Sequence, residues 1–338
     1  MPQTFDLPNV LDIPDLPKYL KQVEACINDS VGAERSKMTN AVIRLTKASG
    51  KRLRPALVIA SALLADEGIN SSVIKTAAAV ELIHIGSLVH DDIIDESSTR
   101  WNIPTINARE GLNYAIIGGD FLFAKACVLA GETSQEAGII AAETITLLCK
   151  GESSEQEVQH NSDRTEAQLE KAIYGKTAAL MAAACELGGI STNQPEDRLE
   201  VLSSFGSDFG MSFQLVDDVL DFVSTDTLMG KQVGNDIKEG IYTLPIILSL
   251  QGPKPATIRK ELAKTDGSLA VLTEILLEDS SITKTIAKAE EYNRSAEQAL
   301  QDVFGKNVHN LAQLPNNYLD WAFSNLVAHQ YKTKVRPV

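Results

Sequence analysis

Two stretches of the chain carry the same arrangement of aspartates. Leu88–Asp95 reads LVHDDIID, and Leu215–Asp221 reads LVDDVLD. Each places Asp-Asp-x-x-Asp at the end of a long apolar segment, and on a helix the first and last aspartates of this motif share one face. The repeated motif therefore predicts two acidic helix faces in a helical protein.

Helical periodicity extends outward from both stretches over nearly the whole chain. Apolar residues recur with helical spacing, no segment alternates long enough to be a sheet, and no Pro/Gly/Ser-rich linker divides the sequence. Prolines interrupt the start of the chain, so we expect an irregular N-terminal arm over 1–16. The continuous helical pattern without a linker predicts one all-α domain spanning 1–338. The predicted helices cover 18–31, 34–48, 54–67, 72–96, 112–132, 134–151, 165–188, 196–223, 241–251, 255–264, 281–301 and 307–330.

Composition narrows the classes of partner. The 338 residues are 44% hydrophobic, and the net charge of −14 repels nucleic acid and anionic lipid. The four cysteines lack the spacing of a zinc site or a disulfide framework, which favours reduced thiols in a cytoplasm. There is no apolar signal region, and no run approaches the ~18 apolar residues of a spanning helix. We expect a cytoplasmic protein with no integral membrane segment and no nucleic-acid partner.

The aspartates require an explanation because they are costly. Like charges four residues apart destabilise a helix by roughly 0.2–0.5 kcal/mol per pair, and unpaired carboxylates beside Ile, Val and Leu are unfavourable. A solvated acidic face is the alternative, but two copies that each interrupt an apolar helix argue against it. Carboxylate oxygens on rigid helices suit Mg²⁺, which completes its coordination with water and substrate phosphates. The motifs therefore predict a magnesium site for a phosphorylated ligand.

Basic residues that could hold the phosphates lie near these motifs. Ser49–Pro55 reads SGKRLRP, a basic turn that opens a helix, and such a turn can cradle an anion, although a solvated turn is the alternative. Arg100 follows the first aspartate cluster, and Lys176-Thr177 lies in an apolar helix. Lys231 lies in the loop that follows the second cluster.

In this order, the motifs resemble those of the trans-isoprenyl diphosphate synthases, the polyprenyl synthetase family. The resemblance runs from about Gly50 to Ser249. It is carried by Gly50-Lys51-x-x-Arg54, His84, Asp91-Asp92-x-x-Asp95, Gly119-Asp120, Lys176-Thr177, Phe213-Gln214-x-x-Asp217-Asp218-x-x-Asp221 and the loop from Gly230-Lys231 to Thr243-Leu244-Pro245.

The resemblance implies a helical bundle with a central apolar tunnel, a homodimer, three Mg²⁺ ions per active site and a prenyltransferase activity. The enzyme would ionise an allylic diphosphate, join it to isopentenyl diphosphate and release a trans-polyprenyl diphosphate. The Mg²⁺ ligands would be Asp91, Asp95, Asp217 and Asp221. The allylic diphosphate would contact Arg100, Lys176 and Lys231. Isopentenyl diphosphate would contact Lys51, Arg54 and His84. The developing cation would lie along Lys176, Thr177 and Gln214.

The chain departs from the family pattern at two positions. Trp101 stands where the family usually has a second arginine, which would hold isopentenyl diphosphate, and Ile241 stands where lysine is common. These departures favour one rival reading, a regulatory subunit of a heteromeric synthase, although six intact aspartates oppose it. A terpene cyclase is the other rival, and the basic turn with His84 opposes it because a cyclase binds no second diphosphate.

Product length depends on the residues one helical turn before Asp91. Gly86 and Ser87 are small, and no aromatic residue stands at either position. By the resemblance, small residues here accompany products longer than farnesyl. We therefore expect a product of at least C20, with C30–C40 as the favoured range. The alternative is that these two residues only permit close helix packing.

Overall fold

The computed structural model of the protein describes residues 5–32, 35–48, 50, 52–101, 103–229, 232–264, 269–305, 308 and 310–335. Nearly all the regular structure is helical, as the sequence predicts. The first half contains α1 (Leu7–Leu11), α2 (Leu16–Gly32), α3 (Lys37–Ala48), α4 (Leu53–Ala62), α5 (Ser71–Ile94), α6 (Ile106–Arg109), α7 (Leu112–Gly131) and α8 (Gln135–Gln156).

The second half begins with three consecutive helical segments, of which the middle one is a π-helical turn. These are α9 (Glu166–Ile173), η1 (Tyr174–Ala178) and α10 (Ala179–Ile190). The remaining elements are α11 (Glu196–Val223), α12 (Asp226–Met229), α13 (Asn235–Lys238), α14 (Leu244–Leu250), α15 (Pro255–Leu262), α16 (Leu269–Glu278), α17 (Ser281–Phe304), η2 (Leu311–Gln313), α18 (Leu314–Asn325), η3 (His329–Tyr331) and α19 (Lys332–Val335).

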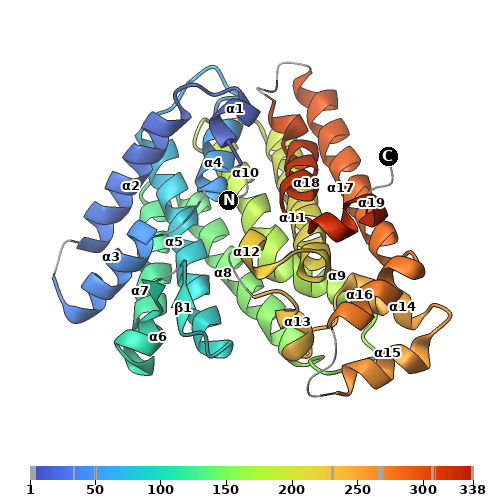
Figure 1. Ribbon diagram of the computed structural model, residues 1–338. Helices are drawn as coiled ribbons and strands as arrows, with labels where there is room; N and C mark the ends of the chain where they lie inside the picture. Colours follow the sequence, from blue (N-terminus) through green and yellow to red (C-terminus); the bar gives the residue numbers. More distant parts are fainter. Residues whose placement is uncertain are drawn as a thin grey trace.

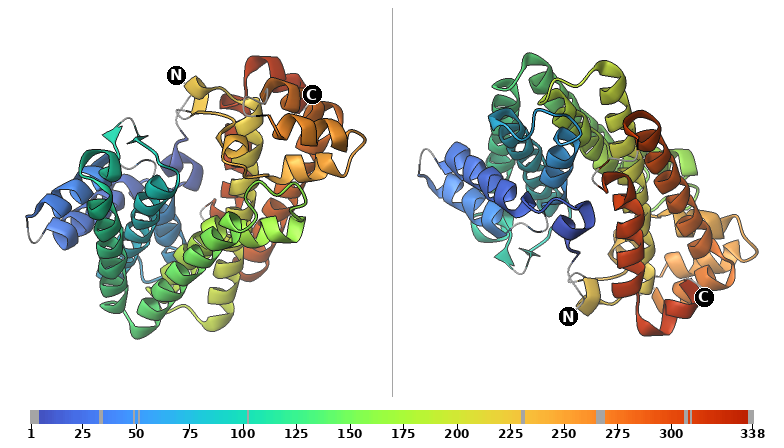
Figure 2. Two further views of the ribbon diagram at one scale, coloured as in Figure 1. Left: turned by 90° about the horizontal axis from the view of Figure 1, so that it is seen from below. Right: turned by 90° about the horizontal axis from the view of Figure 1, so that it is seen from above.

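The helices pack around the two that carry the aspartates. α5 packs against α7, α4, α2 and α10, while α11 packs against α10 and α17. Figure 1 shows the first half of the chain on one side and the second half on the other, with α8, α10 and α11 between them. The same arrangement is visible when the molecule is seen from below and from above (Figure 2). The two aspartate clusters therefore come from opposite halves of the bundle.

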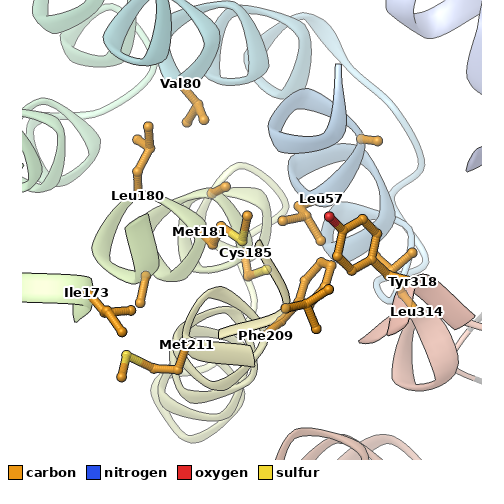
Figure 3. Packing of buried hydrophobic residues seen from close by; sticks show 14 of the residues in the cluster. Leu57, Val80, Ile173, Leu180, Met181, Cys185, Phe209, Met211, Leu314 and Tyr318 are labelled. Carbon is orange, nitrogen blue, oxygen red and sulfur yellow. The ribbon is translucent and has the colours of Figure 1, made fainter. Parts of the chain in front are cut away.

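A continuous core of buried side chains joins these halves. It extends from Phe5 to Val335, and its members in Figure 3 include Val80 of α5, Leu180 of α10 and Phe209 of α11. Burying a side chain of this size stabilises a fold by roughly 1.5–3 kcal/mol. α10 packs between α4 and α11, and nearly every one of its residues is therefore buried in the core.

Local capping explains where the principal helices begin. The Asn70 side chain accepts a hydrogen bond from the Val73 amide at 3.0 Å, which satisfies one free donor at the start of α5. Glu196 and Asp197 lie in the first turn of α11, where negative charge is favourable. The boundaries of α5 and α11 fall within two residues of those predicted from the sequence.

Some elements differ from the sequence predictions. The arm over 1–16 is not wholly irregular, since α1 forms with Pro8 in its first turn, where a missing N–H removes no helical bond. A short antiparallel hairpin pairs β1 (Thr99–Arg100) with β2 (Ile103–Pro104), and α16 was not predicted. The segment predicted over 165–188 contains the π-helical turn η1, which periodicity alone does not distinguish from an α-helix.

Two described helices, α5 and α7, are long and apolar enough to cross a membrane by length and composition alone, a test that the core helix of a bundle also passes. Polar residues interrupt both apolar runs, as Glu81 does in α5, while the average hydropathy stays high. The most apolar window of α5 is 67% buried inside the protein, as in the core helix of a bundle, whereas that of α7 is 39% buried.

Candidate active site

The first aspartate cluster lies at the end of α5. Asp91 and Asp92 occupy its last turn, and Asp95 is the C-cap, whose amide donates to the Asp91 carbonyl at 2.8 Å. Burial raises the pKa of Asp91 to about 7 and also raises the pKa values of Asp92 and Asp95. The positive charge of Lys176 opposes the shift at Asp91 and Asp95, so this lysine lies near the cluster.

Asp92 has a structural role that differs from that of its neighbours. Its side chain is 2% exposed and accepts a hydrogen bond from Arg100 Nε at 2.8 Å. The Asn107 side chain donates to the Asp92 backbone carbonyl at 3.0 Å. Arg100, predicted to bind the allylic diphosphate, is therefore paired with Asp92 and remains beside the cluster.

The second aspartate cluster lies near the end of α11. Asp218 is buried and accepts a hydrogen bond from Gln214 Nε2 at 3.0 Å, while its Oδ2 has no hydrogen-bond partner among the described residues. Burial raises the pKa of Asp218 to about 8. The Asp221 backbone carbonyl accepts a bond from the Gly234 amide at 3.1 Å, which ties the following loop to this helix.

Lys176 and Thr177 approach both clusters from η1. Thr177 Oγ1 donates to Gln214 Oε1 at 2.8 Å, which places these two predicted residues in direct contact and beside Asp218. Burial alone would lower the pKa of Lys176, but the carboxylates of Glu155 and Glu152 outweigh burial and raise it. The predicted catalytic residues Lys176, Thr177 and Gln214 therefore form one contiguous group.

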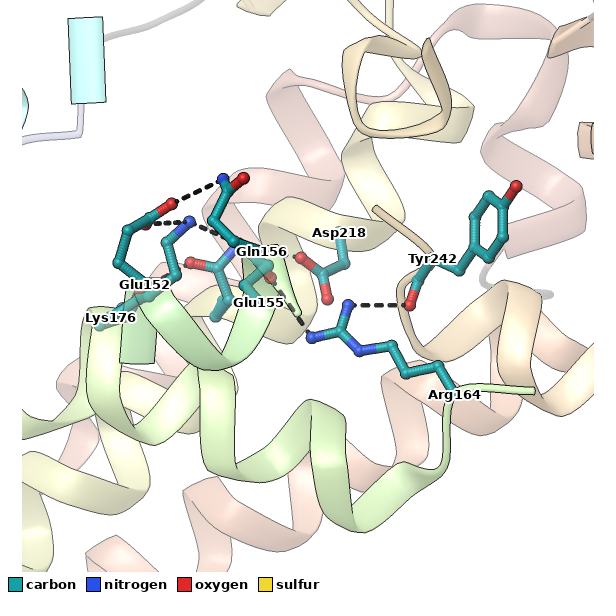
Figure 4. A network of polar contacts seen from close by, with 9 residues as sticks. Glu152, Glu155, Gln156, Arg164, Lys176, Asp218 and Tyr242 are labelled. Atoms are coloured by element: carbon teal, nitrogen blue, oxygen red, sulfur yellow. Dashed lines mark hydrogen bonds and ion pairs between the residues drawn. The ribbon is translucent and has the colours of Figure 1, made fainter. Parts of the chain in front are cut away.

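Two glutamates of α8 that the sequence reasoning missed hold this lysine. Lys176 Nζ lies 2.7 Å from Glu152 Oε2 and also pairs with Glu155 (Figure 4). The contact depends on glycines, because a Cβ atom at Gly175 would lie 2.5 Å from the Gly151 Cα. The only sequence signal for these glutamates is that they closely follow Gly151, at the end of a helix with one buried and one exposed face.

The loop after α11 brings a further carboxylate towards the site. Burial raises the pKa of Glu239, and the charges of Asp95 and Asp221 add to the rise, so Glu239 lies near both clusters. Its side chain pairs with the Asn235 amide. Lys231, predicted to bind the allylic diphosphate, lies outside the described residues.

A second group of cations lies at the start of α4. Arg54 Nη1 is 3.3 Å from His84 Nε2. Burial lowers the pKa of His84 well below its ordinary value, and the nearby Arg54 and Arg100 charges add to this effect, so the imidazole is neutral. Lys51, the third predicted residue of this group, lies outside the described residues.

Arg52 does not belong to that group, although it stands in the same basic turn. Its side chain is 7% exposed, lies 2.6 Å from Glu81 Oε1 and donates to the Thr46 carbonyl at 2.7 Å. It ties α3 and α5 together in the interior. Trp101 lies beside the same turn, since its indole nitrogen is 4.0 Å from the position that a Cβ atom at Gly50 would take.

The predicted chain-length residues have different surroundings. A Cβ atom at Gly86 would lie 2.9 Å from a ring carbon of Phe123 on α7, so Gly86 faces that helix. Ser87 is partly exposed, and its hydroxyl donates to the His84 carbonyl at 2.9 Å. His90, which directly precedes Asp91, has its ring 5.4 Å from that of Phe123 and packs against Gly119.

The donor set fits a divalent cation held jointly with a substrate. Within the described part of the chain, no three acidic, histidine or cysteine side chains converge closely enough to hold a metal ion by themselves. All the candidate ligands are carboxylate oxygens, which Mg²⁺ prefers, and the burial that raises the pKa values of Asp91 and Asp95 marks carboxylates that a bound cation would stabilise in their ionised form. Phosphate oxygens would then complete the coordination between the two clusters.

Comparison with known proteins gives a consistent family. A family model described as polyprenyl synthetase matches residues 35–278. Heptaprenyl diphosphate synthase component 2 of Geobacillus stearothermophilus is 34% identical over 276 residues, covering 81% of this chain and 86% of the relative. Nonaprenyl diphosphate synthase of Mycobacterium tuberculosis is 32% identical over 298 residues, covering 87% of this chain and 86% of the relative.

Solved structures agree with the sequence relatives. A polyprenyl synthase from Caulobacter crescentus, complexed with calcium and isoprenyl diphosphate, superposes with a TM-score of 0.84 at 30% identity. That comparison covers 96% of this chain and 99% of the other. The heptaprenyl diphosphate synthase of Staphylococcus aureus gives a TM-score of 0.83 at 29% identity, covering 94% and 99% of the two chains.

Proposed function

The chain belongs to the polyprenyl synthetase family, and we propose that its two aspartate clusters hold Mg²⁺ against the diphosphate of an allylic substrate. The enzyme is a prenyltransferase that condenses isopentenyl diphosphate with an allylic diphosphate to give a trans-polyprenyl diphosphate of C20 or longer. The observation that carries the proposal is the position of Lys176 and Thr177. Lys176 lies near Asp91 and Asp95, and Thr177 bonds Gln214 beside Asp218.

Different residues would bind the metal, bind the diphosphate and stabilise the allylic cation. Bound Mg²⁺ would neutralise the charge that develops on the departing diphosphate. Asp91, Asp95, Asp217 and Asp221 would hold the metal, and three ions per site is the number that we propose from the family resemblance. Lys176 would donate to the diphosphate, and Thr177 and Gln214 would place their oxygen dipoles along the allylic cation. Arg100 and Lys231 are the other proposed contacts of this diphosphate.

The second substrate would lie against the start of α4. Arg54, His84 and Lys51 would hold the diphosphate of isopentenyl diphosphate. The neutral imidazole of His84 can donate one hydrogen bond to a phosphate oxygen, while the Arg54 guanidinium supplies charge. A site for two diphosphates supports condensation and does not favour a cyclase. The intact aspartates likewise do not favour a purely regulatory subunit.

The product length that we propose is C30–C40. It rests on the small residues one turn before Asp91. Ser87 would line the tunnel that accepts the growing chain, while Gly86 lets α7 approach. Relatives named heptaprenyl and nonaprenyl synthases support a long product. The name "component 2" of one relative leaves a heteromeric assembly as the alternative to a homodimer.

We propose a cytoplasmic homodimer that is built from one domain and joined through α7. Four apolar side chains of this helix are between 44% and 56% exposed, namely Leu112, Ile116, Ile117 and Val128. Several exposed apolar side chains on one helix favour a protein interface there. Light scattering should give twice the chain mass, and Ile117→Asp should give the mass of one chain.

One assay tests the catalytic proposal. Purified protein would be supplied with Mg²⁺, radiolabelled isopentenyl diphosphate and each allylic starter in turn, with products separated by length. Labelled products of C20 or longer that disappear with EDTA and return with Mg²⁺ are expected. Failure to incorporate label with any starter would contradict the assignment.

A further inference from the structure

Arg164 is a buried arginine outside all the motifs described above. It lies in the loop between α8 and α9, and its side chain is 1% exposed. A guanidinium stays protonated in proteins, so this residue places a permanent positive charge in the interior. A buried charge of this kind is unfavourable unless other groups compensate it. Its neighbours therefore indicate what it does.

Three groups from different elements surround the guanidinium. Arg164 Nη2 lies 3.4 Å from Glu155 Oε1, and Nη1 donates to the Tyr242 carbonyl at 3.2 Å. Figure 4 shows the carboxylate of Asp218 facing the same guanidinium. Arg164 Nε and Asp218 Oδ2 are both buried without a hydrogen-bond partner among the described residues. The arginine therefore pairs with Glu155 and lies beside Asp218 of the second aspartate cluster.

Glu155 is itself shared between two cations. One carboxylate oxygen faces Arg164, and the other pairs with Lys176. Lys176 is also held by Glu152 at 2.7 Å, so two negative charges already surround it. If Glu155 paired with Lys176 alone, its attraction would make the lysine less available to a diphosphate. The ion pair with Arg164 weakens the attraction of Glu155 for Lys176.

We propose that Arg164 is a positioning residue that balances Glu155, and so keeps Lys176 available to the allylic diphosphate. Through the Tyr242 carbonyl it also fixes the end of the loop that follows the second aspartate cluster. The inference rests on the proposed role of Lys176 as a diphosphate ligand. It adds a pair, Glu155 with Arg164, that acts on the reaction through another residue and does not touch the substrate.

A charge-pair experiment tests this. Arg164→Leu should raise the KM for the allylic diphosphate about tenfold or more, because Glu155 then acts on Lys176 alone, and should change the KM for isopentenyl diphosphate less than twofold. Glu155→Gln should also impair the enzyme, because it leaves Arg164 as a buried charge with a weaker partner. In the double variant both charges are gone, so kcat/KM should recover to at least about tenfold above Arg164→Leu.

Arg259→Leu is the matched control. Arg259 pairs with Asp163, the neighbour of Arg164 in the same loop, at 2.8 Å, but both side chains are largely exposed. Exposed ion pairs contribute little to stability, and this pair does not contact Lys176 or Glu155. Both KM values of Arg259→Leu should therefore stay within twofold of wild type. Thermal unfolding of every variant separates loss of fold from loss of charge balance.

The outcomes are distinct. Wild type that incorporates no label contradicts the proposed function itself. An active wild type with equal changes in both KM values for Arg164→Leu, or with a double variant no better than that single, makes Arg164 only structural and overturns the inference. If Arg164→Leu does not fold, Arg164→Gln and Arg164→Lys decide. Gln removes the positive charge and Lys keeps it, so a selective rise in the allylic KM for Arg164→Gln, with a smaller rise or none for Arg164→Lys, supports the inference. Equal allylic KM values in these two variants contradict it.

Discussion

The ring of Phe123 on α7 occupies the space in front of Gly86 on α5, where a Cβ atom would lie 2.9 Å from a ring carbon. The sequence places no aromatic residue one turn before Asp91, yet the fold brings one there from a different helix. Gly86 and Ser87 are therefore not equivalent. Gly86 permits α7 to approach, as the close-packing alternative for this position supposes, whereas Ser87 is partly exposed.

Removal of a metal ligand should abolish turnover without unfolding the protein. Asp91→Ala and Asp217→Ala each remove a carboxylate from a cluster of like charges, which relieves repulsion while losing the cation. We expect kcat to fall by about a hundredfold or more and the helical circular dichroism to persist. Asp197→Ala, on the exposed first turn of α11, is the control and should keep near-normal activity. Near-normal turnover in either cluster variant would refute the two-cluster model.

Stability without metal should fall as the pH rises. Burial raises the pKa of Asp91 to about 7 and that of Asp218 to about 8, above the ordinary value of 3.8. The folded state therefore binds protons that the unfolded state releases between pH 4 and about 7–8. Within this pH window, each such carboxyl lowers the free energy of unfolding by about 1.4 kcal/mol per pH unit.

Denaturant titrations in EDTA from pH 5 to 8 should show this loss. The Asp218→Asn variant should have a shallower slope, because its share of the titration is gone, whereas the general repulsion from the net charge of −14 remains. Mg²⁺ should also flatten the wild-type slope, since it stabilises the ionised carboxylates. An identical slope in wild type and Asp218→Asn would show that this carboxyl does not titrate in the window.

Restoring a family arginine should improve binding of the second substrate. Trp101 has a positive φ of 49°, which arginine tolerates no worse than tryptophan, and its indole lies beside Gly50. Trp101→Arg should lower the KM for isopentenyl diphosphate by roughly tenfold, in line with about 1.5–3 kcal/mol for a charge-assisted contact. The allylic KM should change little.

An unchanged KM would indicate that another cation serves this phosphate. Arg52 cannot be that cation, because its guanidinium is engaged with Glu81 and the Thr46 carbonyl in the interior. Trp101→Gln, which offers hydrogen bonds without charge, is the matched control. It should leave the KM near the wild-type value if charge is what the site lacks.

Much of this site can be read from the sequence because its residues form local motifs. The helical period places Asp91 and Asp95 on one face, and Lys176 stands out as a charge in an apolar helix. Glu155 and Arg164 could not be found in this way. Glu155 reads as an ordinary polar residue near the end of a surface helix, and Arg164 as one in a loop. The fold alone shows that α8 faces η1, through the close approach of Gly151 to Gly175. The π-helical turn has no distinguishing period in a short segment, so it was also missed.

Product length should depend on Ser87 more than on Gly86. The Ser87 side chain is partly exposed, one turn before Asp91, and helical side chains lean towards the N-terminus. Phenylalanine at this position should fill the tunnel one to two isoprene units below the reacting carbon and shift the product from the C30–C40 range towards C15. Condensation should continue, since no proposed metal or diphosphate contact changes. Overpacking costs roughly 1–3 kcal/mol, so stability must be measured separately.

Two further variants separate a tunnel wall from a packing defect. Gly86→Ala introduces a Cβ atom against the Phe123 ring, so it should lower the unfolding temperature while leaving product length close to that of wild type. Ser71→Phe, at the exposed start of the same helix, should affect neither property. The measurement is chromatography of the dephosphorylated products. A wild-type product of C10 or C15, or a Ser87→Phe product as long as that of wild type, would show that Ser87 does not form the wall of the tunnel.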